Sequence, residues 1–258
     1  MKIVTVAQMR ELERRAVDSG LTEDSLMESA GLSAARRLAQ IINGIRGKRV
    51  VVLVGSGNNG GDGMVAARYL ADWGGLVTLY MTSARRRDDK FKDCHARHVR
   101  VVEAVDDIGH LELASYVSLA DVVVDAVLGI GNNRPLSDPL RAIFEELGRL
   151  KEKQPALRYI ALDVPSGLEA DTGSVDKACF PANVTLTLGA PKAGLYCFPG
   201  AAYGGDVEVL AIGLPSELDG DFPVELCDEG AVAPLLPKRP LDGHKGSFGN
   251  LLVVAGSR

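Results

Sequence analysis

The sequence predicts an α/β protein with a Rossmann-like, three-layer α/β/α fold and a mostly parallel central sheet. Short apolar runs rich in β-branched residues alternate with segments of helical apolar spacing, a pattern typical of parallel strands joined by right-handed crossovers. Glycine-rich and polar motifs directly follow several of these runs, as expected where strand ends line a binding crevice. We expect strands at residues 50–54, 76–81, 121–127, 158–162, 184–188 and 206–212, and helices at 60–73, 88–100 and 139–151.

Two leading N-terminal helices are expected before the first strand. Thr5 and Gln8 form a capping-box pattern for a helix that runs to about Asp18. Thr22 can cap the second helix, whose apolar residues recur at helical spacing until Asn43-Gly44 ends it. We expect this pair to cover one side of the sheet.

The composition is that of an ordinary globular protein. The 258 residues are 46% hydrophobic and 24% charged, which suits one large domain with a small appendage. A net charge of −5 argues against nucleic-acid or anionic membrane partners. The N-terminus lacks a signal-peptide core, no run is long enough to cross a bilayer, and the four cysteines are widely separated. We therefore expect a cytoplasmic protein without disulfides.

The most informative motif is the glycine-rich loop at residues 55–63, which lies between the first predicted strand and its helix. Glycines let a ligand approach the backbone closely, and the N-terminus of a helix offers free N–H groups and the positive end of a dipole. The loop therefore predicts a phosphate site for a nucleotide. No ribose-binding Asp or Glu follows the second strand at residues 82–85, which disfavours an ordinary dehydrogenase. The arginines at 85–87 leave two alternatives, a contact with a 2′-phosphate or a solvated basic loop.

Three further motifs follow later strands, at residues 125–135, 163–168 and 189–194. The carboxyl ends of parallel strands meet at one edge of the sheet, so these motifs should converge with the glycine-rich loop in space. Together the four motifs resemble the N-terminal YjeF domain, the NAD(P)H-hydrate epimerase. The likeness covers roughly residues 1–215 and includes the two leading helices.

The resemblance implies an enzyme of nicotinamide nucleotide repair. Its substrate would be NAD(P)HX, which is NADH or NADPH hydrated at C6 of the nicotinamide ring, and its reaction the interconversion of the R and S hydrates. A non-catalytic nucleotide-binding or scaffold module is the alternative, and an NADP-dependent dehydrogenase is a third. The sequence does not distinguish NADHX from NADPHX.

The resemblance also implies the site residues. Asp163 is the expected acid/base, and Asn59, Asp125 and Ser166 match positions that hold K+ in the family. A large monovalent cation suits neutral oxygens with at most one carboxylate. Taken alone, Asp125 would equally suit a residue that caps a loop through backbone N–H groups. The alternative for Lys192 is a solvated loop lysine. The expected substrate-binding residues are Asn58, Asn59, Gly60, Gly61, Asp62, Gly129, Ile130, Gly131, Asn132, Asn133, Arg134, Pro135, Asp163 and Lys192.

Residues 221–258 are expected to be distinct from an epimerase domain at residues 1–220. Residues 244–257 are similar to the opening of the ADP-dependent NAD(P)H-hydrate dehydratase that many bacteria carry fused behind the epimerase. We expect a linker and the truncated beginning of that domain, with an apolar strand at 251–255 and no dehydratase activity from these residues. A dehydratase domain would then act in cis or in trans. The oligomeric state stays open, with a homodimer as one alternative.

Overall fold

The computed structural model describes residues 1–85, 87–131, 135–214, 222–236, 241–244, 246–249 and 251–256. The chain divides into two compact units. The larger spans residues 2–224, and the smaller consists of Met1 with residues 225–258.

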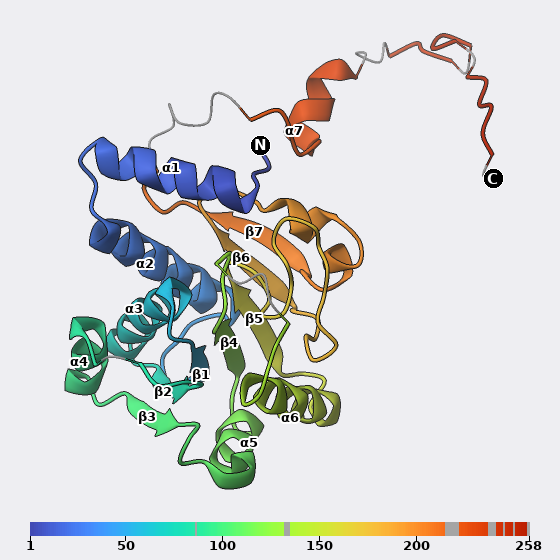
Figure 1. Cartoon of the computed structure of the whole chain (residues 1–258). Coiled ribbons are helices and arrows are strands. Elements are labelled where there is room, and N and C mark those ends of the chain that lie inside the picture. The colour runs from blue at the N-terminus through green and yellow to red at the C-terminus, as the bar shows by residue number, and fades with distance from the viewer. Residues whose placement is uncertain are drawn as a thin grey trace. The chain divides into compact units, whose positions relative to one another are not determined.

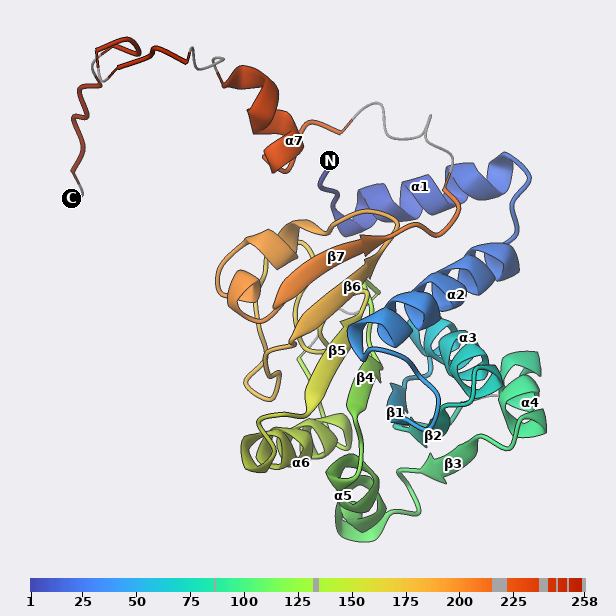
Figure 2. The ribbon, with the colours of Figure 1, turned by 180° about the vertical axis from the view of Figure 1, so that it is seen from behind.

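The larger unit is built on a seven-stranded sheet in which every pair of neighbouring strands is parallel, so the predicted fold class is confirmed (Figures 1 and 2). The strand order is β3-β2-β1-β4-β5-β6-β7. Their bounds are β1 (Arg49–Val54), β2 (Leu76–Met81), β3 (Arg100–Glu103), β4 (Val122–Ala126), β5 (Arg158–Leu162), β6 (Val184–Leu188) and β7 (Asp206–Leu210). From β1 the chain continues through β2 and β3 toward one edge of the sheet, and from β4 it continues through β5, β6 and β7 toward the other edge. A crevice at the carboxyl ends of these two strands is where such sheets bind ligands.

Helices cover both faces of the sheet. They are α1 (Val6–Asp18), α2 (Glu23–Ile41), α3 (Asn58–Asp72), α4 (Asp89–Ala96), α5 (Leu111–Ser118) and α6 (Leu140–Lys153), with short 3-10 turns η1 (Ile108–His110), η2 (Ala193–Tyr196) and η3 (Gly200–Ala202). The first four lie on one face, and α5 and α6 lie on the other (Figures 1 and 2). Thr5 and Thr22 cap α1 and α2 through capping boxes, as the sequence predicted for Thr5.

Alternate residues of the central strands build two separate cores. In β1, Val52 is buried against the α1–α4 side, whereas Leu53 is buried against the α5–α6 side. This follows from the two-residue period of a strand. Burial on both faces explains the nearly continuous apolar runs of β1 and β4. The two cores hold the carboxyl ends of these strands rigidly in place.

The structure differs from the sequence-based expectation after residue 96. The expected helix 88–100 stops at Ala96, because His98 takes a left-handed backbone with φ 57°. The chain then forms β3, which pairs with β2 at the sheet edge, and α5 carries it to the opposite face. Neither β3 nor α5 was predicted. With four residues, of which only Val102 is fully buried, β3 has a weak signal.

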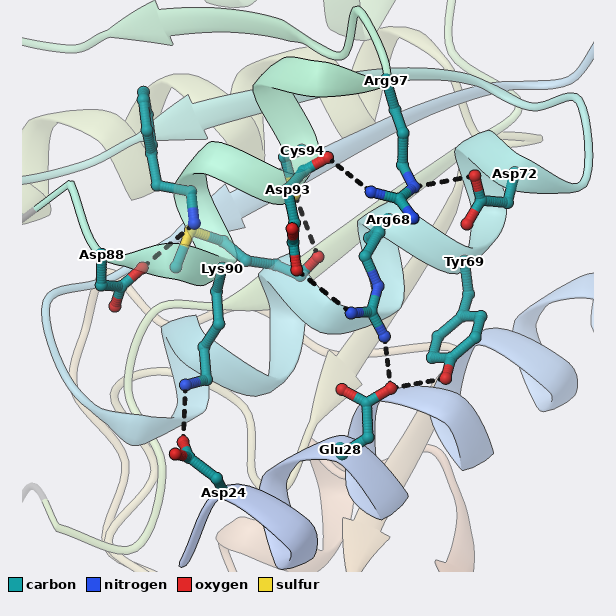
Figure 3. Close-up of polar contacts among 12 residues, drawn as sticks. Asp24, Glu28, Arg68, Tyr69, Asp72, Asp88, Lys90, Asp93, Cys94 and Arg97 are labelled. Carbon is teal, nitrogen blue, oxygen red and sulfur yellow. Dashed lines mark hydrogen bonds and ion pairs between the residues drawn. The ribbon is translucent and has the colours of Figure 1, made fainter.

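Polar contacts fix α4 to α2 and α3 (Figure 3). Lys90 of α4 donates to Asp24 of α2 at 2.8 Å, and Arg97 donates to Asp72 of α3 at 2.8 Å. Arg68 of α3 pairs with Glu28 of α2 and with Asp93 of α4. This polar network sets the position of α4 and of the loop that precedes it.

The smaller unit contains the short helix α7 (Glu229–Val232) and the 3-10 turn η5 (Ala233–Leu235). Asp228 caps α7 by accepting from the Ala231 N–H at 2.9 Å. The strand predicted at residues 251–255 is not formed, and Leu251 and Val254 are 89% and 90% exposed. A strand without neighbours leaves its backbone unpaired and is not stable alone, which accounts for the difference. Among the helices of the described ranges, none combines the length and the apolar character needed to cross a membrane.

Candidate active site

A pocket of about 890 Å³ lies at the carboxyl edge of the sheet. Its sheet side is formed by residues from the ends of β1, β4, β5 and β6, including Asn59, Gly129, Asp163 and Lys192. Residues of α1 and of the start of α2 form another wall. The motifs that are scattered in the sequence therefore converge on one pocket, as predicted.

The glycine-rich loop shapes the start of α3. The N-cap residue Gly57 makes no side-chain cap, so the first-turn N–H groups stay available to an anion. Gly60 must be glycine here, because an added Cβ would lie 2.1 Å from the carbonyl oxygen of Gly55. Arg85 lies over the loop and donates from Nη1 to the carbonyls of Gly55 and Gly57 at 3.0 and 2.6 Å. Its side chain is only 10% exposed, so the solvated alternative does not hold for Arg85.

Asn59 connects the first turn of α3 to two other loops. Its Nδ2 donates to the carbonyl oxygens of Leu128 and Leu162, at 3.0 Å in each case. Its Oδ1 is buried and has no hydrogen-bond partner among the described residues. A buried acceptor without a donor is unfavourable and calls for a partner.

Asp125 lies near the end of β4 and is completely buried. Its carboxylate accepts from the Tyr159 hydroxyl and the Ser166 Oγ at 2.7 Å each, and from the N–H groups of Ser166 and Val127 at 2.8 and 3.2 Å. Burial raises the pKa of Asp125, while these hydrogen bonds act in the opposite direction. Ser166 Oγ also accepts from the N–H of Leu128 at 2.9 Å. Asp125 and Ser166 thus fasten the loops after β4 and β5 to each other.

Asp163 and Lys192 form a buried ion pair. Lys192 Nζ lies 2.6 Å from Asp163 Oδ1, and the two side chains are 1% and 8% exposed. Lys192 Nζ also donates to the carbonyl of Leu188 at 2.6 Å and to Thr187 Oγ1 at 3.2 Å. Lys192 is therefore not a solvated loop lysine. Asp163 takes a left-handed backbone with φ 70°, and its Oδ2 accepts from the Ile130 N–H at 3.1 Å.

Two of the other carboxyl groups that line the pocket have raised pKa values, those of Asp62 on α3 and Glu13 on α1. Burial raises the pKa of Asp62 well above its usual range, and the charges of Asp163 and Glu13 add to this. Burial also raises the pKa of Glu13, again reinforced by Asp163. No role was predicted for Glu13 from the sequence. A signal was available, because Glu13 lies four residues after Met9 on the buried face of α1.

The sequence matches the family described as "YjeF-related protein N-terminus" over residues 23–194. A protein of Elusimicrobium minutum named NAD(P)H-hydrate epimerase is 36% identical, over 84% of this chain and 98% of that protein. The chain belongs to the YjeF N-terminal family. The resemblance of the four sequence motifs to this family is therefore confirmed.

Longer members of the YjeF N-terminal family are also similar to this chain. The bifunctional NAD(P)H-hydrate repair enzyme Nnr of Thermofilum pendens is 40% identical over all of this chain and 48% of that protein. The corresponding Nnr of Coxiella burnetii is 37% identical, over 96% of this chain and 49% of that protein. The chain thus spans about half the length of these relatives. The crystal structure of yeast ynu0 (YNL200c) shares the fold, with a TM-score of 0.71 at 24% identity over 89% of this chain and 98% of that one.

In this YjeF N-terminal domain, the pocket brings together most of the substrate-binding residues that the sequence predicted. Those that line it are Asn58, Asn59, Asp62, Gly129, Ile130, Gly131, Asp163 and Lys192. Gly60 and Gly61 shape the loop behind the pocket surface, and Pro135 is exposed outside the lining. Asn132, Asn133 and Arg134 lie outside the described residues.

Proposed function

We propose that this chain is an NAD(P)H-hydrate epimerase, which interconverts the R and S hydrates of NADH and NADPH at C6. The observation that carries the proposal is that an uncapped helix N-terminus and a buried Asp–Lys pair open into one pocket. The first feature suits the phosphates of a dinucleotide, and the second suits proton transfer at a reacting ring. The name of the Elusimicrobium minutum relative supports the same reaction.

Each part of the pocket has a role in this proposal. The first turn of α3, with Asn58 and Asn59, binds the phosphate region, and the Gly129 loop supplies further nucleotide contacts. Asp163 transfers the proton at the C6 hydroxyl. Lys192 holds Asp163 in place through the 2.6 Å contact and keeps its buried charge compensated. The left-handed backbone of Asp163 fixes the direction of its side chain.

We further propose that K+ binds at Asn59, Asp125 and Ser166. The unpartnered Oδ1 of Asn59 and the complete burial of the Asp125 carboxylate, which has no ion-pair partner in the described part of the chain, both suit a monovalent cation. Neutral oxygens from the loops after β4 and β5, such as the carbonyls of Leu128 and Leu162 near Asn59, could complete the shell. The ion would compensate the buried charge and hold three loops together.

For residues 221–258 we propose a linker and the beginning of the second half found in the bifunctional relatives. The match to the Thermofilum pendens protein supports this, because it extends over all of this chain. The dehydratase domain would then be a partner in cis or in trans. A cytoplasmic location and a homodimer stay predictions from the sequence.

The decisive experiment gives the purified chain each separated hydrate, R or S. Interconversion is followed by chiral chromatography against the spontaneous background at the same pH. An epimerase brings either hydrate to the same equilibrium mixture faster than the background. A non-catalytic nucleotide-binding module would bind the hydrates without changing the rate, and a dehydrogenase would require a hydride acceptor.

A further inference from the structure

We propose that Glu13 of α1 is a second proton-transfer residue of this pocket, working from the helical wall while Asp163 works from the sheet edge. The inference rests on the proposed epimerase function and deepens it. Glu13 lies on the first helix, ahead of residues 23–194 that match the family.

Backbone hydrogen bonds fix α1 to the loop that carries Lys192. Val4 donates to the carbonyl of Pro191 at 2.9 Å, and Ala193 donates to the carbonyl of Val4 at 3.1 Å, so Val4 is bonded to both chain neighbours of Lys192. The N–H of Val6 at the start of α1 donates to Asp171 Oδ1 at 2.6 Å. The helix is therefore a fixed wall of the pocket, and its side chains have defined positions there.

Glu13 lies on the buried face of this wall. Its neighbours on that face, Met9, Leu12 and Ala16, are 1%, 1% and 0% exposed, and Glu13 itself lines the pocket. Its carboxyl group makes no hydrogen bond or ion pair with any residue in the described ranges. Glu13 is half-buried, so its carboxyl group stays accessible from the pocket beside an apolar helix face and can meet a ligand there.

Glu11 of the same helix provides the contrast. Its carboxylate pairs with Arg14 and Arg15 at 2.8 Å in each case, and hydrogen bonds from these arginines lower its pKa to about 2. Glu13, by comparison, is free to exchange a proton with a ligand. The charged groups of this pocket that interact with Glu13 electrostatically include Arg10 on its own helix, Glu23 on α2, Asp62 on α3, Asp163 after β5 and Lys192 after β6. Burial and the charge of Asp163 favour the protonated form of Glu13, whereas Lys192 and Arg10 oppose it.

When inversion at C6 proceeds by loss and re-addition of water, two proton-transfer groups serve it well, because the hydroxyl leaves from one face of the ring and returns to the other. Protonated Glu13 gives its proton to the C6 hydroxyl as the C6–O bond breaks, so water leaves with the bonding pair and the N1 lone pair forms a C6=N1 double bond. Water then adds to the opposite face, the double-bond pair returns to N1, and the Asp163 carboxylate takes the proton of the added water. The reverse reaction exchanges the two roles, which suits an acid on one wall and a base on another.

The test compares Glu13→Gln with Glu11→Gln, an equal change two residues away on the exposed side of α1. We expect Glu13→Gln to lower kcat by about a hundredfold or more with KM near the wild-type value. The limb of the wild-type rate that declines as pH rises through the pKa of Glu13 should disappear. Glu11→Gln should keep the wild-type rate and pH profile. Glu13→Asp, which retains the acid but shortens its reach, should keep the pH limb at a reduced rate.

A Glu13→Gln variant with wild-type kcat would overturn the proposal. So would a rise in KM alone, which would make Glu13 a binding residue. Circular dichroism of each variant shows that loss of rate is not loss of fold. If the wild-type chain itself fails to interconvert the hydrates, the epimerase proposal fails, and this outcome is distinct from the failure of Glu13.

Discussion

Lys192 Nζ lies 2.6 Å from Asp163 Oδ1, and both side chains are almost completely removed from solvent. Asp163 directly follows β5, and Lys192 lies four residues beyond β6, the neighbouring strand. The loop after β6 brings Lys192 back over the end of that strand, where its Nζ donates to the carbonyl of Leu188. A buried ion pair adds little to the free energy of unfolding, because the cost of desolvating both charges largely offsets their attraction. We therefore assign this pair a role in the reaction and not in stability. This pair is the centre of the proposed reaction site.

Removing only the cation should therefore be costly. Lys192→Met leaves the Asp163 charge buried without compensation, and we expect the free energy of unfolding to fall by about 3–5 kcal/mol. Urea unfolding at pH 7 measures this directly. Lys153→Met, at the exposed end of α6, should change it little. Equal stabilities of the two variants would show that the pair does not have the assigned role.

Asp163→Asn should keep the fold and lose the reaction. Asparagine tolerates the left-handed backbone at φ 70° about as well as aspartate does, and its shape is nearly the same. The amide cannot take up the proton, so we expect epimerisation to slow by about a hundredfold or more. A variant with the wild-type rate would remove Asp163 from the mechanism.

The two glycines at positions 60 and 57 should respond differently to a methyl group. In Gly60→Ala the new Cβ would lie 2.1 Å from the backbone oxygen of Gly55, so the loop must shift, and we expect a loss of about 1–3 kcal/mol or more. Gly57→Ala meets nothing within 4 Å and should keep the wild-type melting temperature. Thermal unfolding of the two variants side by side makes the comparison. Similar melting temperatures would contradict the packing described for this loop.

Asp62 should make stability depend on pH. Its folded-state pKa is raised, mainly by burial, so the folded protein holds this proton more tightly than the unfolded chain does. Its stabilising contribution is complete below the unfolded pKa of about 3.9 and is lost as pH rises through the folded value. Asp62→Asn should therefore melt at a higher temperature than wild type at pH 8, and the gain should shrink toward pH 4. In the control variant Asp106→Asn, at an exposed position, the difference in melting temperature from wild type should not depend on pH in this way. A melting temperature of Asp62→Asn below that of wild type at pH 8 would contradict the account.

The proposed cation site can be tested without the reaction. Replacing potassium chloride by lithium chloride at equal ionic strength should lower the melting temperature, because an ion that binds only the folded state stabilises it. Asp125→Asn removes the one carboxylate of the site and should abolish the difference between the salts. Identical melting curves of the wild type in both salts would rule out the K+ site.

The sequence predicted those features in which local pattern and tertiary environment agree. The buried β1 has an unbroken apolar run and was predicted correctly. The turn after it was also expected, but α3 begins at Asn58, two residues earlier than predicted, so part of the glycine-rich motif is helical. The edge strand β3 was missed because pairing with β2, more than its own four residues, makes it a strand. Residues 251–255 are the opposite case. Their apolar sequence predicts a strand, but no strand forms there, because no neighbouring strand pairs with them in the described part of the chain.

In the candidate site, too, residues within local sequence motifs could be predicted, whereas residues that depend on distant contacts could not. The position of Asp163 and Asn59 at the pocket could be predicted, because these residues follow parallel strands whose ends come together. The burial of Lys192 and Arg85 was not foreseen, because the partners that bury them lie far away in the sequence. Glu13 was missed because a single acidic residue on a helix gives no motif. Its four-residue spacing from Met9 indicates only the inward side of α1, and the pocket position that supports its proposed role becomes visible only in the fold.

The most direct test of the central claim is the rate at which the purified chain interconverts the separated R and S hydrates of NADH and NADPH. We predict that either hydrate relaxes to the same mixture well above the spontaneous rate, and that Asp163→Asn returns the rate nearly to that background. Relaxation of both hydrates at the spontaneous rate in the presence of the folded wild-type chain would contradict the proposed function.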